Sequence, residues 1–198
     1  MTRIDTTFAR LRREGRKGLV TFLTAGDPRP EDTVGLLHAL VSAGADVLEL
    51  GIPFTDPMAE GPVIQRASER ALAHDVTLDD VLEMVRIFRG RDAETPVVLM
   101  GYANPVERMG PSRFAERAAE VGVDGLITVD MPPEEASDWA RPLPEVGVAP
   151  IMLVAPTTTE DRLGRALELG RGFIYYVSMT GVTGGAGLDV ASVEAHVK

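Results

Sequence analysis

The stretch that decides the fold is residues 44–65, GADVLELGIPFTDPMAEGPVIQ. It contains a glycine suited to ending a helix, a short apolar strand, a loop rich in proline and glycine, and a helical pattern that begins at Pro62. A strand followed by a helix is the repeating unit of α/β proteins with parallel sheets. The segment GVDGLIT, from Gly122, repeats the junction between helix end and strand. We therefore expect a chain built of βα units.

The same alternation continues along the rest of the chain. Short runs rich in Val, Ile and Leu predict six strands, at residues 19–23, 47–50, 97–101, 125–129, 149–154 and 173–178. Apolar residues at helical spacing predict helices between them, over residues 31–42, 63–73, 78–88, 113–120 and 161–168. Strands that alternate with helices in this way indicate a parallel sheet.

Two parallel-sheet folds fit this order, an open doubly wound sheet and a closed (β/α)8 TIM barrel. The open sheet would usually carry a glycine-rich phosphate loop after its first strand, whereas here that strand runs into TFLTAGDP. We therefore predict the barrel. Because a full barrel takes about 250 residues and eight strands, residues 1–198 are expected to form a single, C-terminally incomplete barrel domain with about six βα units.

The composition excludes several classes of function. With 30 acidic and 20 basic residues the net charge is −10, which argues against nucleic-acid binding. The lack of cysteine rules out disulfides and thiolate metal sites and is compatible with a cytoplasmic location. No apolar run has the length of a membrane span, and no signal peptide is expected. His38, His74 and His196 are isolated, so we expect them on helix surfaces and predict no zinc site.

The first candidate for chemistry is Glu49, because functional residues of a barrel lie at the carboxyl ends of its strands. Alternation puts Glu49 on one face with Val47, while Leu48 and Leu50 take the other. Two leucines suit the helix layer, so Glu49 is expected to face the barrel interior. Partial burial there would raise its pKa and suit it to proton transfer near neutral pH. A structural ion pair with an interior Lys or Arg explains the position equally well.

The loop after this strand carries Asp56 and Glu60 among three prolines, and a loop stiffened in this way at a strand end is typical of a functional site. Glu60 could act as a second carboxylate over the same cavity. An acidic residue just before a helix is also favoured by the helix dipole, and the pattern alone favours this explanation. Further along, Tyr102 and Asn104 could contact a substrate or a partner, and the glycine-rich SMTGVTGGAG could form a lid or an anion-binding loop.

Taken together, several segments resemble the signature of one family. They are LELGIPFTDPMAEGPVIQ, LMGYANP, the turn Asp130-Met131-Pro132 and YYVSMTGVTGG, which occur in the same order in the tryptophan synthase alpha subunit family. The resemblance covers essentially the whole chain. It implies a lyase of tryptophan biosynthesis that cleaves indole-3-glycerol phosphate to indole and glyceraldehyde 3-phosphate, with no metal or organic cofactor on this subunit.

The resemblance also assigns roles to residues. Glu49 matches the acid/base of the family. Glu60 stands where the family has an aspartate that stabilises charge at the indole N–H, and its extra methylene moves the carboxylate by about 1.5 Å. The residues expected to bind substrate are Phe22, Met100, Tyr102, Ile127, Val129, Leu153, Tyr175, Thr183 and Gly184, the last two in the lid loop.

The implied partner is a beta subunit that carries pyridoxal phosphate, in an alpha2beta2 heterotetramer. Asp56, Asn104 and Pro105 match the surfaces that contact it. Two other functions stay open on the sequence. One is a non-catalytic alpha-like partner that binds and activates a beta subunit, and the other is a barrel enzyme that acts on a different sugar phosphate.

Overall fold

The computed structural model describes residues 1–178 and 193. In this part of the chain, six parallel strands form one sheet whose spatial order follows the sequence. They are β1 (Val20–Thr24), β2 (Val47–Gly51), β3 (Val97–Gly101), β4 (Gly125–Thr128), β5 (Ala149–Val154) and β6 (Ile174–Tyr176). A doubly wound sheet reverses its strand order midway, so this sequential order is that of a barrel. The predicted strands and the predicted fold class are confirmed.

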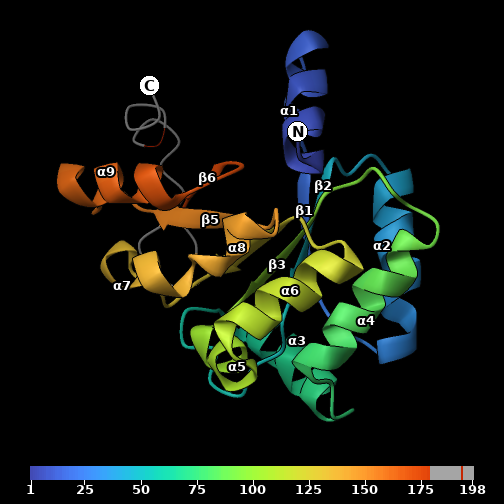
Figure 1. The fold of residues 1–198 in the computed structure, drawn as a ribbon. Coiled ribbons are helices and arrows are strands. Elements are labelled where there is room, and N and C mark those ends of the chain that lie inside the picture. Colours follow the sequence, from blue (N-terminus) through green and yellow to red (C-terminus); the bar gives the residue numbers. More distant parts are fainter. Residues whose placement is uncertain (179–192, 194–198) are drawn as a thin grey trace.

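Helices connect successive strands along the chain and cover the outer face of the sheet (Figure 1). The predicted ones are α2 (Thr33–Ser42), α3 (Pro62–Leu72), α4 (Leu78–Arg89), α6 (Pro111–Val121) and α9 (Glu160–Leu169). A 3-10 turn, η1 (Pro30–Asp32), replaces the expected first residues of α2. The sequence patterns missed α1 (Arg3–Arg13), α5 (Ala103–Met109), α7 (Pro133–Trp139) and α8 (Pro142–Glu145). None of the helices that the structure describes is long and apolar enough to span a membrane.

The sheet separates two apolar layers. On its outer face, Leu48 and Leu50 pack into the larger core together with side chains of the helices. On its inner face, Val47, Val98 and Ile127 belong to a second core inside the barrel. Because side chains alternate along a strand, Glu49 shares the inner face with Val47, as predicted.

Helix α1 closes one end of the barrel interior. Ile4 is fully buried and packs into the inner core with Val47, Val98 and Ile127. The helix starts with a capping box, in which the Thr2 side chain accepts from the Asp5 N–H and the Asp5 carboxylate accepts from the Thr2 N–H. Figure 1 shows α1 standing at the end of the sheet where the chain enters β1 and β2. Helix α1 does not cover the opposite end of the barrel, where the carboxyl termini of the strands lie and where the functional residues of a barrel are expected.

The two similar segments of the sequence, which begin at Gly44 and Gly122, form the same local structure. Gly44 and Gly122 have φ of +107° and +87°, the region in which glycine ends a helix most easily, as predicted. Each is followed two residues later by a buried aspartate. Asp46 accepts from the Leu19 N–H at 2.9 Å and Asp124 from the Val97 N–H at 2.8 Å, so each carboxylate ties its own strand to the start of the preceding one.

Arginines neutralise both aspartates. Arg16 donates to Asp46 at 2.6 Å, and this hydrogen bond is the main reason why the pKa of Asp46 falls to about 2. Asp124 accepts from Arg89 at 2.6 Å and from Arg3 of α1 at 3.0 Å. Helix α1 is therefore held both by apolar contacts inside the barrel and by charge at its rim.

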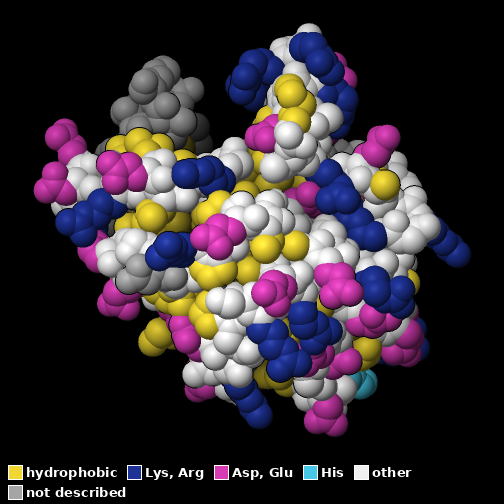
Figure 2. All heavy atoms as spheres, in the orientation of Figure 1, with side chains coloured by type: hydrophobic (Ala, Val, Ile, Leu, Met, Phe, Trp, Pro, Cys, Tyr) yellow, Lys and Arg dark blue, Asp and Glu magenta, His cyan; other side chains and the backbone are white. Residues whose placement is uncertain are grey.

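The surface is mixed in charge. Figure 2 shows Lys and Arg side chains interspersed with Asp and Glu over the face that it displays. One expectation about the surface is wrong. The His38 ring is partly covered, stacks on Phe88 with ring centres 4.7 Å apart, and has a buried Nε2, because α2 packs directly against α4.

Candidate active site

Glu49 lies near the carboxyl end of β2 and is only 4% exposed. Phe22 of β1 and Val98 of β3 are its partners in the sheet register. Burial among apolar neighbours disfavours the charged form, and it raises the pKa of Glu49 from 4.5 to about 7. Within residues 1–178 the carboxylate forms no ion pair. The structure therefore favours a group that can gain or lose a proton at neutral pH over the structural ion pair.

An apolar wall surrounds this carboxyl on the inner face of the sheet. Met100, Ile127, Val129, Leu153 and Tyr175 pack on the inner core, as expected of residues that line one cavity. They come from β3, β4, β5 and β6 or directly follow them. The wall is apolar, which suits an aromatic ring better than a free sugar.

Tyr175 is the polar member of this wall. Burial raises the pKa of its phenol, and the charges of Glu49 and Glu60 raise it further. Both carboxylates therefore lie within electrostatic reach of the same hydroxyl. The sequence predicted the three residues separately, and the structure brings them to one end of the barrel.

Phe22 is 37% exposed and lies over Gly51. A Cβ at Gly51 would lie 2.6 Å from the Phe22 Cζ, closer than side chains approach one another. Gly51 thus allows the Phe22 ring to lie flat across the end of β2, beside Glu49. This contact could not be predicted, because nothing in a single sequence shows which glycine faces an aromatic ring.

The loop that carries Glu60 is folded back over the strand ends. Glu60 donates its N–H to the Pro57 carbonyl at 3.0 Å, and the Gln65 side chain donates to the Glu60 carbonyl at 2.9 Å. The Ala59 N–H donates to the Tyr102 hydroxyl at 2.9 Å. Glu60 is half-buried and lines a cavity together with Phe22 and Met100. The structure therefore places Glu60 beside the predicted substrate wall.

Tyr102 acts mainly as a support for this loop. It is 5% exposed, and its ring stacks on Phe54 with centres 5.1 Å apart. Burial and the nearby charges of Glu60 and Asp130 raise the pKa of its phenol. Asp130 in turn accepts from the Ala103 N–H at 2.8 Å and so holds the start of α5. The residues of GYANP and of the turn after β4 thus form one structure behind Glu60.

The predicted partner residues lie outside this cavity. Asp56 and Asn104 are exposed and Pro105 is half-buried, on the loop after β2 and on α5. A groove of ≈ 550 Å³ runs along this side, and its lining includes Asp56, Tyr102 and Met58. Met58 is 80% exposed and lies on this groove.

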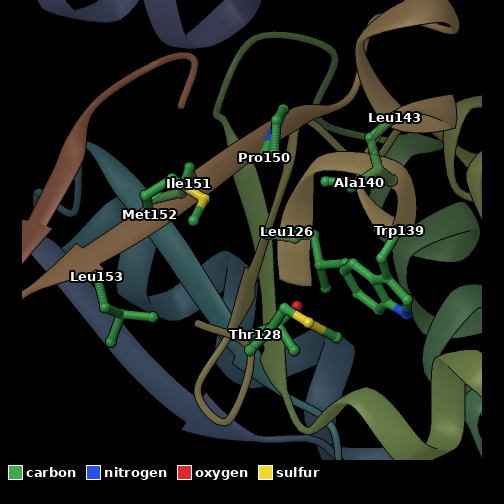
Figure 3. Close-up of a pocket in the computed structure, with 11 residues that line it drawn as sticks. Leu126, Thr128, Trp139, Ala140, Leu143, Pro150, Ile151, Met152 and Leu153 are labelled. Atoms are coloured by element: carbon green, nitrogen blue, oxygen red, sulfur yellow. The ribbon is translucent and has the colours of Figure 1, made fainter. Parts of the chain in front are cut away.

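Another cavity, of ≈ 20 Å³, lies between β4, β5 and the helices α7 and α8 (Figure 3). Its strand residues include Leu126 and Met152, whose side chains point away from the inner core. Figure 3 shows Trp139 beside Leu126 on this outer side. This cavity therefore lies in the packing of the helices against the sheet, and Ile151 and Leu153 of the inner core also line it.

Two predicted site residues, Thr183 and Gly184, lie outside the described residues, as does His196. Among the residues that the structure does describe, no group of three or more His, Asp or Glu side chains could hold a metal ion.

Comparison with known proteins agrees with this geometry. The family model for the tryptophan synthase alpha chain matches residues 8–198. The tryptophan synthase alpha chain of Burkholderia thailandensis is 59% identical over 197 residues, which are 100% of this chain and 73% of that one. The alpha chain of Ralstonia nicotianae is 58% identical and is covered over 74% of its length.

Solved structures give the same result. A crystal structure of the tryptophan synthase alpha chain from Legionella pneumophila subsp. pneumophila is 49% identical and has a TM-score of 0.91, over 99% of this chain and 72% of that one. A chain of the tryptophan synthase a2b2 complex of Pyrococcus furiosus is 39% identical and has a TM-score of 0.76, over 80% of this chain and 64% of that one.

Proposed function

This chain belongs to the tryptophan synthase alpha chain family, and on that premise we propose that it cleaves indole-3-glycerol phosphate to indole and glyceraldehyde 3-phosphate, with Glu49 as acid/base and Glu60 as second carboxylate. The observation that carries the proposal is the buried, inward-facing Glu49 whose pKa is about 7. A group with a pKa near the working pH is the most effective proton donor and acceptor.

The reaction needs one group that both gives and takes a proton. Protonation of indole C3 makes the bond between C3 and the glycerol chain breakable. Removal of the proton from the adjacent glycerol hydroxyl then lets the O–H electron pair form a new carbonyl, while the C–C bond breaks and its electron pair returns to the protonated indole ring. If Glu49 gives the first proton and takes the second, it ends in its starting state. A carboxyl with a pKa of about 7 is populated in both forms at neutral pH.

The Glu60 carboxylate is proposed to accept a hydrogen bond from the indole N–H. It would also stabilise the positive charge that develops on the ring after protonation. Its place beside Phe22 and Met100 supports this role. The apolar side chains of Met100, Ile127 and Leu153 would hold the ring flat and keep water away, which strengthens the effect of both carboxylates. Phe22, Val129, Tyr102 and Tyr175 complete the proposed indole pocket, and Thr183 and Gly184 are proposed to close it and to contact phosphate.

We also propose that the chain pairs with a beta subunit in an alpha2beta2 assembly, as in the tryptophan synthase a2b2 complex of Pyrococcus furiosus. The exposed Met58 and the groove beside Asp56 support a contact surface here, with Asn104 and Pro105 on the neighbouring helix. A single barrel domain over residues 1–198 and a cytoplasmic location are parts of the same proposal.

The test is indole release by the full chain and by its Glu49→Gln variant, with indole-3-glycerol phosphate as substrate. We expect the wild type to form indole and the variant to lose turnover by at least about 100-fold while it still binds indole propanol phosphate, because only the proton-transferring oxygen is replaced. Glu83→Gln, in an exposed ion pair with Arg86, is the matched control and should behave as wild type. Turnover retained by Glu49→Gln would overturn the assignment. A wild type that stimulates a beta subunit yet forms no indole would favour the non-catalytic partner.

A further inference from the structure

A small cavity lies beneath the loop that carries Glu60, at the carboxyl ends of β1, β2 and β3. Its volume is ≈ 20 Å³, and most of its lining is apolar, including Phe22, Ile64 and Met100. Four residues with polar side chains also line it, Thr24 at the end of β1, Glu60 on the loop, Ser68 on α3 and Tyr102 after β3. Polar residues from different elements thus line one space beside the proposed substrate wall.

Thr24 has a buried polar group at this cavity. It is 4% exposed, and its Oγ1 is fully buried without a hydrogen-bond partner among the residues that the structure describes. A buried hydroxyl without a partner is destabilising, and native proteins rarely leave one without an ordered water or another polar group nearby. The cavity is the place where such a partner can lie.

The size and the lining of the cavity fit one water molecule. A water needs about 10–15 Å³ of free space and two to four polar partners, and an apolar cavity of this size would stay dry. Here ≈ 20 Å³ is available, and four residues with polar side chains, Thr24, Glu60, Ser68 and Tyr102, line the space.

We propose that Thr24 is a positioning residue for Glu60, and that it acts through one water held in this cavity. The Thr24 hydroxyl donates to the water, and the water donates to the Glu60 carboxylate. The proposal rests on the function proposed above, in which Glu60 must present an oxygen to the indole N–H. The direction of this carboxylate matters, because misplacement of a catalytic group by about 1 Å can cost about 100-fold in rate.

The experiment compares Thr24→Val, Thr24→Ser and Thr21→Val in the full chain, by steady-state indole release. Valine keeps the shape of threonine and removes only the hydroxyl, whereas serine keeps the hydroxyl. Thr21 is the matched control, because it lies on the same strand and also has a buried Oγ1 without a partner among the described residues. It points to the opposite, helix-covered face with Leu23 and does not line the cavity.

We expect Thr24→Val to lower kcat by about 10-fold with little change in KM, because the mispositioned carboxylate fails mainly when charge develops in the transition state. Thr24→Ser and Thr21→Val should stay within about two-fold of wild type. In a Glu60→Gln background, Thr24→Val should cause little further loss, because the two residues act on the same interaction.

Equal kcat values for Thr24→Val and Thr21→Val would overturn the proposal, and so would a full, additive loss in the Glu60→Gln background. Thermal unfolding shows whether each variant is folded. If Thr24→Val does not fold, a high-resolution crystal structure of the wild type decides, since a water within hydrogen-bond distance of both Thr24 and Glu60 oxygens is required and a dry cavity contradicts the proposal. Failure of the proposed function itself looks different, because the wild type would then form no indole.

Discussion

The Glu49→Gln variant should be more stable than the wild type at alkaline pH, and the gain should fade as the pH falls. Glu49 is buried, and burial raises the pKa of its carboxyl from 4.5 to about 7 in the folded protein. The folded state therefore holds a proton that the unfolded chain releases more readily. Between these two values, a rise in pH stabilises the unfolded state relative to the folded one.

The magnitude follows from the displacement of the pKa. The difference between 4.5 and about 7, at ~1.36 kcal/mol per pKa unit, corresponds to about 3 kcal/mol of lost stability once the pH is well above 7. At pH 5 the loss is about 1 kcal/mol, because the carboxyl is still protonated in the folded state. Glutamine has nearly the same shape and no charge to bury, so Glu49→Gln should recover about 2–3 kcal/mol at pH 8.5 and much less at pH 5.

Urea unfolding at pH 5, 7 and 8.5, followed by circular dichroism, measures this difference. Glu83→Gln is again the control, because its exposed ion pair with Arg86 contributes little. A stability difference between wild type and Glu49→Gln that is the same at all three pH values would refute the reasoning, since it would mean that Glu49 is ionised in the folded protein throughout this range. A gain that grows with pH would support it without any activity measurement.

Three further outcomes are expected. Ile4→Ala should lower the free energy of unfolding by about 2–5 kcal/mol in urea titrations, because the side chain is fully buried inside the barrel; an unchanged midpoint would mean that α1 does not close the barrel. Asp46→Asn should cost about 2 kcal/mol at pH 7, because Arg16 holds the pKa of Asp46 at about 2, and the gap to wild type should close as the pH falls from about 4 towards 2. Tyr102→Phe removes the acceptor of the Ala59 N–H and should lower kcat for indole formation by about 10-fold with a nearly unchanged melting temperature, and wild-type kcat would contradict the proposed support of the Glu60 loop.

Much of the fold could be predicted from the sequence because its signals are local. Alternation within residues 47–50 was enough to place Glu49 on the inner face, since Leu48 and Leu50 could satisfy only the helix layer. The glycine turns at Gly44 and Gly122 were also local, because a positive φ is a property of one residue and its neighbours. The strand ends moved by one or two residues without changing which side chains face inward.

What the sequence did not show depends on contacts between distant segments. Helix α1 was missed because its arginines suggest a solvated segment, whereas its stability comes from Ile4 inside the barrel and from ion pairs of Arg3 with Asp124 and Arg10 with Asp46. In the same way, the sequence favoured proton transfer and a structural ion pair equally as explanations of Glu49. The structure decides between them, because the surroundings of Glu49 are apolar and it forms no ion pair among the described residues. The cavity beside Thr24 is formed by three strands, the loop after β2 and α3, so no single stretch of sequence indicates it.

The most direct test of the central claim is the pH dependence of kcat/KM for indole formation by the wild-type chain. If the free enzyme uses Glu49 as its acid/base, the profile should show an inflection near pH 7, where the buried carboxyl changes its protonation state. A direct titration of the Glu49 carboxyl by NMR should give the same value. A rate profile that is flat between pH 5.5 and 8.5, or a Glu49 pKa near the ordinary 4.5, would contradict the account.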